Sequence, residues 1–238
     1  MRINSDHWLI TRPIAHRGLW GGDIIENSLS AYQNAVQNGY PIEIDLYSSK
    51  DGVLMSFHDS TLKRMTGEDG FIFDKTFSFL SSLSLLGSKE KIPTFDQVLS
   101  LVDGKVPLLI ELKNQPDKNY VSSVVERLKN YKGEFAVQSF NPLLIKKVKK
   151  LAPEFIRGIL GSEKDGANFF ERFIVKHMPL NFLVKPDFIS YSHTGLPLKK
   201  RKTKNKAVIC WTIENQETAN SALKNAQNII FENFIPKK

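Results

Sequence analysis

Cysteine and long apolar runs are the two features that this chain most clearly lacks. Cys210 is the single cysteine among 238 residues, so no disulfide can form within the chain. Its neighbours, AVICWTI, are typical of a buried core thiol. No window approaches the roughly 18 continuous apolar residues of a membrane span, and Asp6 and His7 interrupt the first residues before a signal-peptide core could form. These absences lead us to expect a cytoplasmic protein without stable membrane insertion.

An excess of acidic charge is also missing. Lys and Arg number 33 against 25 Asp and Glu, which gives a formal net charge of +8. Such a field attracts anions, whether phosphorylated metabolites, nucleic acid or an acidic membrane surface, but it does not choose among them. With 41% hydrophobic and 24% charged residues, the composition is that of a globular protein and excludes a disordered chain.

Short β-rich runs alternate with helical patterns along the whole chain. The predicted strands are 13–17, 41–47, 106–113, 134–140, 154–160, 186–192, 207–213 and 228–233. Between most of them, apolar residues recur at spacings of three and four, which predicts helices. Eight strands alternating with helices predict parallel pairing, and the length suits a single-domain α/β fold, a (β/α)8 barrel of the TIM type over residues 1–238. An open doubly wound sheet is the alternative.

Local signals add detail to this barrel. Asn27 and Thr94 stand where helix N-caps are expected, and Gly39 and Gly104 stand where helices should end. The segment 68–92 fits the alternation least well, and we predict a loop excursion with a short helix near FLSSLSLLG.

A basic run, LKKRKTKNK at 198–206, holds six cations in nine residues. Because it leads into a predicted strand, the barrel places it on the face opposite the carboxyl ends of the strands. We interpret it as a solvated helix face and loop, and we predict no nucleic-acid partner.

Paired acids in the run PIEIDLY point to a metal. Glu43 and Asp45 alternate with apolar residues, so the strand period sends both carboxylates to one face. In a parallel series both faces are normally covered, and two carboxylates in one covered space repel unless a cation lies between them. In PLLIELK, Glu111 and Lys113 share a face near the carboxyl end of their strand, where barrels carry their chemistry. The three acids would suit Mg²⁺ or Ca²⁺ better than zinc.

Two histidines stand near these acids in the predicted fold. His16 in AHRG follows the first strand as a candidate acid or base, and Arg17 is a candidate phosphate clamp. Asp51-Gly52 predicts a two-residue hairpin in which Lys50 pairs with Val53, which would bring His58 opposite Asp45. A longer loop would shift the register by one and turn His58 to the other face.

An ordered set of motifs extends from residue 16 to residue 212. His-Arg-Gly, Glu-Asn, Glu-x-Asp, Asp-Gly and His-Asp occur in that order, followed by LLIELK, VQSFNP and CWT. This pattern resembles the bacterial type of the glycerophosphodiester phosphodiesterase family. The resemblance implies a (β/α)8 barrel that uses one divalent cation to hydrolyse a small-molecule glycerophosphodiester to sn-glycerol 3-phosphate and an alcohol.

The resemblance also implies roles for individual residues. His16 and His58 would form the general acid–base pair, and Glu43, Asp45 and Glu111 would bind the metal, Mg²⁺ or Ca²⁺. The remaining implied roles are phosphate contacts for Arg17 and Lys113 and a place in the pocket wall for Trp211.

Two departures from the family pattern and two alternatives complete the expectations. Ile25 stands where proline is usual, and Glu232 or Asn233 stands where aspartate is usual. We expect neither position to touch the acids or the histidines. One alternative is a lipid phosphodiesterase that acts on phospholipid or lysophospholipid, with Leu19-Trp20 or 71–86 as an apolar lid. The other is a non-catalytic barrel that binds phosphate or a polyanion through its net charge.

Overall fold

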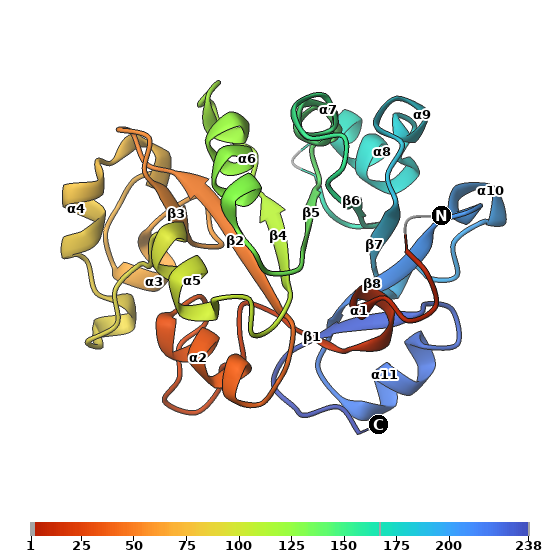
Figure 1. Ribbon diagram of the computed structural model, residues 1–238, viewed down its shortest axis with the longest axis horizontal. Coiled ribbons are helices and arrows are strands. Elements are labelled where there is room, and N and C mark those ends of the chain that lie inside the picture. Colours follow the sequence, from red (N-terminus) through yellow and green to blue (C-terminus); the bar gives the residue numbers. More distant parts are fainter. Residues whose placement is uncertain (1–2, 167, 238) are drawn as a thin grey trace.

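Eight parallel strands form a closed barrel in the computed structural model, with helices packed around it (Figure 1). The structure describes residues 3–166 and 168–237. The barrel strands are β1 (Ile14–Ala15), β2 (Ile42–Ser48), β4 (Leu108–Leu112), β5 (Phe135–Ser139), β6 (Arg157–Gly161), β7 (Phe188–Ser192), β8 (Ala207–Ile213) and β9 (Asn228–Phe231). Strand β1 pairs with β2 on one side and with β9 on the other, so the sheet closes. The predicted single-domain barrel is confirmed, and the open sheet is wrong.

Helices cover the outside of the barrel between successive strands. The main ones are α2 (Leu29–Gln37), α5 (Phe95–Val102), α6 (Tyr120–Asn130), α7 (Pro142–Leu151), α8 (Phe169–His177) and α11 (Gln216–Ala222). Shorter helices are α1 (Trp8–Thr11), α9 (Asn181–Val184) and α10 (Lys200–Thr203). Within the described ranges, no helix combines the length and the apolar composition needed to cross a bilayer.

The strand alternation divides the side chains of β2 between two environments. Ile42, Ile44 and Leu46 point outward and join a core with residues of α2, α5 and α6. A separate apolar cluster fills the barrel at the amino ends of the strands, and it includes Ile14 and Leu109 beneath helix α1. The interior at the carboxyl ends is therefore left for polar side chains.

The helix starts show one correct and one wrong cap prediction. Thr94 caps α5 through a capping box, since its Oγ1 accepts from Gln97 N at 3.1 Å and Gln97 Oε1 accepts from Thr94 N at 2.8 Å. Asn27 does not cap α2. Ser28 does, accepting from Ala31 N at 3.1 Å, because the Asn27 side chain turns inward to Asp45.

The hairpin after β2 has a different register from the predicted one. Strand β3 (Leu54–Ser56) pairs Leu46 with Ser56, so Phe57 stands opposite Asp45 and donates its N–H to Asp45 O at 3.0 Å. The loop has three residues, 50–52, and the predicted pairing of Lys50 with Val53 is wrong by one position. The physical reason is Ser49, whose Oγ donates to Asp51 Oδ1 at 2.7 Å and accepts from Val53 N at 2.9 Å, which closes the longer loop.

The segment after the hairpin packs against β2 and β3 rather than against the barrel helices. It contains α3 (Lys63–Thr66), η1 (Ile72–Asp74), α4 (Phe77–Ser82) and η2 (Leu85–Gly87). Ile72, Leu80 and Leu85 bury their side chains against Met55 and Phe57 in a hydrophobic cluster of their own. This cluster fixes the outer side of the hairpin.

Two glycines with nearly the same φ offer a test of packing. Gly18 and Gly52 have φ of 86° and 87°, in the left-handed region where the backbone strains any side chain. A Cβ at Gly18 would meet Ala31 Cβ at 2.8 Å, whereas a Cβ at Gly52 would meet nothing within 4 Å. We expect Gly52→Ala to lower the free energy of unfolding by about 1 kcal/mol and Gly18→Ala by roughly 1–3 kcal/mol more. Urea unfolding measures both losses, and equal losses would contradict the close packing at Gly18.

Candidate active site

Strand register brings the polar side chains together at the carboxyl end of the barrel. Asp45 pairs with Glu111, and Glu111 pairs with Gln138, so three inward side chains stand side by side on β2, β4 and β5. His16 and Glu232 directly follow β1 and β9, which pair Ala15 with Phe231. The barrel geometry therefore assembles residues that are far apart in the sequence.

Three carboxylates form the centre of this arrangement. Glu43, Asp45 and Glu111 each offer an oxygen, and these oxygens all lie within 4.8 Å of one another. The three residues are only 2%, 0% and 8% exposed, so water screens their mutual repulsion poorly. Lys113 lies among them, with Nζ 2.8 Å from Asp45 Oδ1 and 2.7 Å from Glu111 Oε1.

The pKa values of this cluster show how far its charge is balanced. Burial would raise the pKa of Asp45, but Lys113, His58 and Arg17 outweigh burial and hold it below its ordinary value. Burial, then Asp45 and Glu111, raise the pKa of Glu43 well above its ordinary value. The chain's own cations thus leave Glu43 under-compensated. A divalent cation fits here because it would let all three oxygen ligands ionise together.

His16 is held by a carboxylate from the last strand. Its Nδ1 lies 2.5 Å from Glu232 Oε2, and its backbone N donates to Phe231 O at 2.9 Å. Burial lowers the pKa of His16, while the hydrogen bond to Glu232 raises it and the charge of Arg17 lowers it. Our expectation that position 232 touches neither acids nor histidines is wrong. Because Nδ1 is engaged by Glu232, Nε2 is the ring nitrogen available to a ligand.

His58 reaches the cavity from beyond the end of β3, where strand alternation no longer sets its direction. Its Nδ1 lies 2.7 Å from Asp59 Oδ1, and Arg64 Nε donates to Asp59 Oδ2 at 2.6 Å. Arg64 also donates to Glu26, which in turn accepts from Arg17 Nη1 at 3.0 Å. An unbroken chain of opposite charges therefore links His58 to Arg17.

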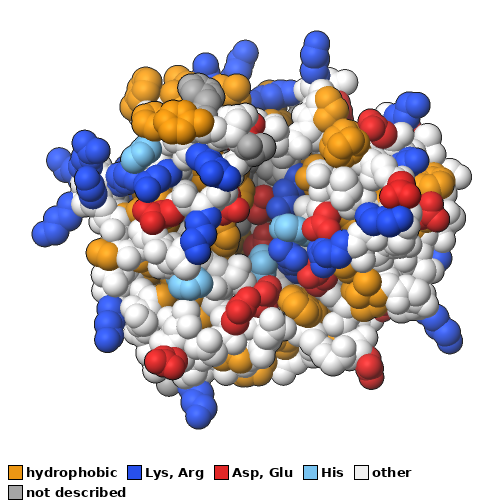
Figure 2. Space-filling model, turned by 180° about the vertical axis from the view of Figure 1, so that it is seen from behind, with side chains coloured by type: hydrophobic (Ala, Val, Ile, Leu, Met, Phe, Trp, Pro, Cys, Tyr) orange, Lys and Arg blue, Asp and Glu red, His pale blue; other side chains and the backbone are white. Residues whose placement is uncertain are grey.

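A cavity of about 80 Å³ opens onto these groups, and Figure 2 shows histidine, acidic and basic side chains meeting in the central cleft. It is lined by His16, Arg17, Glu43, His58, Glu111, Lys113, Gln138, Phe140, Leu160, Trp211, Thr212 and Ile230. Asp45 is not on this lining, but it forms an ion pair with Lys113, which is. The structure thus brings together all eight residues that the sequence singled out.

Three residues of this lining have a buried polar atom without a hydrogen bond. Among the residues that the structure describes, Arg17 Nε, Gln138 Oε1 and Trp211 Nε1 make no hydrogen bond. Buried polar groups are normally satisfied, so their common direction toward one cavity indicates a polar ligand. Phe140 packs edge-on against Trp211, with ring centroids 5.7 Å apart, and fixes that part of the wall.

Sequence reasoning from the individual residues missed four members of the site. Asn27 donates to Asp45 Oδ2 at 3.0 Å, and its Oδ1 accepts from Tyr32 at 2.7 Å, so it orients a metal-ligand candidate. Gln138 lines the cavity, and Glu26 and Arg64 connect the two histidine elements. The motifs Glu-Asn and VQSFNP contain three of the four, which was the available signal. Arg64 had none.

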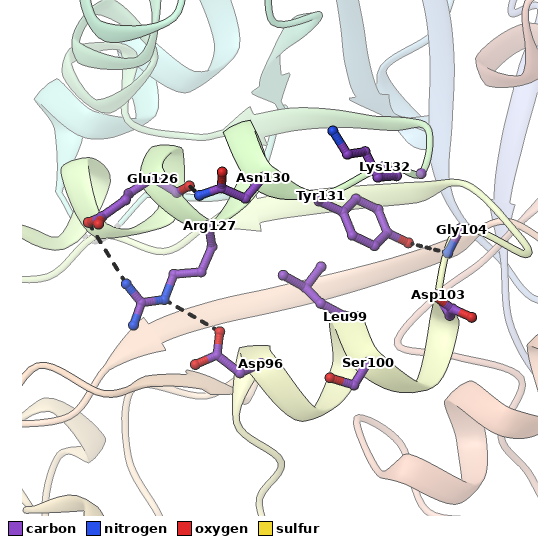
Figure 3. Close-up of a pocket in the computed structure, with 11 residues that line it drawn as sticks. Asp96, Leu99, Ser100, Asp103, Gly104, Glu126, Arg127, Asn130, Tyr131 and Lys132 are labelled. Carbon is purple, nitrogen blue, oxygen red and sulfur yellow. Dashed lines mark hydrogen bonds and ion pairs between the residues drawn. The ribbon is translucent and has the colours of Figure 1, made fainter.

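A larger cavity of about 520 Å³ lies between α5 and α6 (Figure 3). Its lining includes Gly104 and Gly133, which belong to the loops that enter β4 and β5. Those loops lie at the amino ends of the strands, opposite the carboxylates and histidines. Arg127 spans the cavity to Asp96 at 3.4 Å, a surface ion pair. Size alone therefore does not identify the functional site in this molecule.

Comparisons with known proteins agree with this geometry. The model of the glycerophosphoryl diester phosphodiesterase family matches residues 16–235. YhdW of Bacillus subtilis (strain 168), named as a candidate glycerophosphodiester phosphodiesterase, is 30% identical over 222 residues, covering 87% of each chain. The glycerophosphodiester phosphodiesterase of Caldanaerobacter subterraneus subsp. tengcongensis is 33% identical over 164 residues, covering 63% of this chain and 66% of that one.

A solved structure is similar over nearly the whole chain. It is a phosphodiesterase of Oleispira antarctica in complex with the product sn-glycerol-3-phosphate. It is 25% identical in sequence, has a TM-score of 0.77, and the match covers 94% of this chain and 93% of that one.

The contact between Glu232 and His16 generates a prediction about titration. Because the Glu232 carboxylate raises the pKa of His16, we expect Glu232→Gln to move that pKa to lower pH. NMR titration of the histidine ring signals measures the shift. Glu217→Gln on α11 removes the same charge without touching His16 and should leave its pKa in place. An unchanged His16 titration in Glu232→Gln would show that this hydrogen bond does not form.

Proposed function

Because the chain belongs to the glycerophosphoryl diester phosphodiesterase family, we propose that it hydrolyses glycerophosphodiesters to sn-glycerol 3-phosphate and an alcohol, using one divalent cation, Mg²⁺ or Ca²⁺. One observation carries the proposal: three buried carboxylates and two carboxylate-held histidines meet at one cavity. The complex of the Oleispira antarctica phosphodiesterase with sn-glycerol-3-phosphate supports this product for the chain.

Substrate binding begins with charge. A phosphodiester is an anion, and Arg17 and Lys113 supply the cationic groups on the lining of the cavity. Glu26 accepts from Arg17 Nη1 and orients the guanidinium, while Arg17 Nε makes no hydrogen bond, lies 3.8 Å from Asp45 Oδ2 and is the donor left for a phosphate oxygen. Lys113 bridges Asp45 and Glu111, and it would contact phosphate only with a change in those two contacts.

A divalent cation held by Glu43, Asp45 and Glu111 would supply positive charge beside the phosphate, which reduces repulsion of the nucleophile and stabilises the transition state. Hydrogen bonds within the chain hold two of these carboxylates in place. Asn27 donates to Asp45, and the backbone N of Arg17 donates to Glu43 Oε2 at 3.1 Å. These contacts fix the ligand oxygens before any ion binds.

The histidines would move the protons. An oxygen nucleophile, either water or the neighbouring glycerol hydroxyl, attacks phosphorus, and the bond from phosphorus to the alcohol oxygen breaks. Attack by water gives sn-glycerol 3-phosphate directly, whereas attack by the hydroxyl gives a cyclic phosphate that water must then open. One histidine takes the proton of the nucleophile, and the other gives a proton to the leaving oxygen. Glu232 and Asp59 each engage an Nδ1, which leaves Nε2 of each imidazole as the nitrogen for proton transfer.

Removal of either imidazole tests this assignment. We expect His16→Ala and His58→Ala each to lower kcat on glycerophosphocholine by on the order of 10²–10⁴-fold, because each removes one proton-transfer step. His177→Ala on the outer face of α8 is the matched control and should retain the full rate. Near-full activity of either active-site variant would remove that histidine from the mechanism.

Metal removal tests the second part. Protein treated with EDTA and dialysed should lose turnover, and Mg²⁺ or Ca²⁺ should restore it, since the carboxylates alone repel the substrate. Glu43→Gln should raise the metal concentration needed for half-maximal activity by roughly 10–100-fold. The exposed control Glu68→Gln should not change it. Full activity of metal-free protein would refute the metal requirement.

A further inference from the structure

The surface formed by α8, α9 and α10 combines two features that the proposed reaction does not use. It exposes aromatic side chains, and it gathers cations around them. We define this α8–α10 surface by Phe169, Phe173, Phe182, Lys185, Lys199, Lys200, Arg201 and Lys204, all of which are exposed.

The phenyl rings of the α8–α10 surface are exposed to solvent. Phe169, Phe173 and Phe182 are 87%, 47% and 74% exposed. Phe169 and Phe173 are four residues apart on α8, and His177 continues the stripe with its ring centroid 4.8 Å from that of Phe173. The opposite side of α8 already packs on the barrel through Val175. Helix α8 is thus apolar on its outer side as well, which is typical of a helix that meets another apolar phase.

The cations around these rings crowd one another. Burial, then Lys202, Lys176 and further cations, lower the pKa of His177. The nearby acid Glu163 lies 3.5 Å from Lys176, and its charge also acts on Lys202, where the neighbouring cations Arg201 and Lys199 act against it. Lys202 is tied back by donating to Lys176 O at 2.8 Å. Lys199, Lys200, Arg201 and Lys204 of the run are exposed to solvent.

Rings and cations share one open groove. A cavity of about 910 Å³ runs between the helices and is lined by Phe173, Phe182, Lys185, Arg201 and Lys204, among others. A ligand at this groove would therefore meet apolar and cationic groups at the same time.

The groove and the active-site cleft can be seen from the same side of the molecule (Figure 2). Helix α8 follows the loop at the carboxyl end of β6, and Leu160 of β6 lines the active-site cavity. Figure 2 shows apolar and basic side chains gathered at the upper left, beside the central cleft. The groove extends from there along the side of the barrel, since Lys185 and Lys204 on its lining precede β7 and β8 near the amino ends of those strands.

We propose that the α8–α10 surface docks the protein on membranes that contain anionic phospholipids. Phosphate headgroups would pair with the lysines and Arg201, while the phenyl rings enter the boundary between headgroups and acyl chains. A nucleic acid would satisfy the cations, but three rings spread over two helices offer no continuous platform for stacked bases. The basic run, which the sequence suggested was only a solvated face, would then be half of a membrane-binding surface.

Vesicle flotation tests the proposal. The probes are vesicles of phosphatidylcholine alone and of phosphatidylcholine with about 30% phosphatidylglycerol. We expect the full chain to bind only the anionic vesicles, and less tightly as salt rises. Phe169→Ser/Phe182→Ser and, separately, Lys200→Gln/Arg201→Gln/Lys204→Gln should each weaken binding at least about tenfold.

Two controls match these variants. Lys105→Gln/Lys129→Gln/Lys132→Gln removes the same net charge from α6 and the loops that enter β4 and β5, and Leu223→Ser removes an exposed apolar side chain at the end of α11; Lys132 lines the cavity of Figure 3. Both should bind vesicles within about twofold of the unaltered protein. All four variants should keep the turnover of soluble glycerophosphocholine, which separates a failure of docking from a failure of the proposed reaction.

Three results would overturn the proposal. They are no binding of the unaltered protein to anionic vesicles, equal losses in the charge variant and its control, and full binding by either α8–α10 variant. Nucleic acid is the other ligand to be tested. Its binding is measured with a single-stranded oligonucleotide by fluorescence anisotropy. Binding of the oligonucleotide through this surface without vesicle binding would identify a nucleic-acid site and reject the membrane.

Discussion

Repulsion among three buried carboxylates is the constraint on which the rest of this molecule depends. Glu43, Asp45 and Glu111 face one another inside the barrel, where a low dielectric strengthens their repulsion and burial removes their hydration. An apolar set of side chains could fill the same space, as Ile14 and Leu109 do at the amino ends of the strands. The chain instead holds the acids in place with hydrogen bonds and ion pairs: Lys113 contacts Asp45 and Glu111, and Asn27 donates to Asp45. These contacts fix the geometry of the acids, whereas apolar side chains in the same place would make a more stable core.

The charges around this centre alternate in sign, and that alternation connects the elements that carry the histidines. Arg17 contacts Glu43 through its backbone and Glu26 through its side chain, and Arg64 then joins Glu26 to Asp59. These contacts connect the loop after β1 to the residues that follow the hairpin of β2 and β3, beyond the point where the strands β1 and β2 pair. The hydrophobic cluster behind the hairpin also helps to position His58. It buries Met55 and Phe57 on one side of the hairpin, and His58 is the next residue along the chain.

Much of the fold was predictable because it depends on local pattern, whereas the finer geometry depends on single tertiary contacts. Alternating apolar residues and helical spacings predicted all eight barrel strands, and period two predicted that Glu43 and Asp45 share a face. The hairpin register was not predictable from Asp51-Gly52, because the Ser49 hydroxyl selects the longer loop. The resemblance marked Glu232 or Asn233 as a position where aspartate is usual, but nothing in the sequence indicated that Glu232 contacts His16. Its contact with His16 exists only because the last strand closes on the first.

The net positive charge of the chain is distributed unevenly, and this unevenness distinguishes two kinds of surface. Inside the barrel each cation has a carboxylate partner: Lys113 lies on Asp45 and Glu111, and burial, which would lower its pKa, is outweighed by these two acids so that its pKa rises. On the α8–α10 surface the balance is reversed, and cations lower the pKa of a histidine that burial has already lowered. A protein gains no folding stability from crowding like charges beside exposed rings. The exposed rings and cations therefore fit the membrane docking that we propose for this surface, whereas the paired charges of the barrel build the site itself.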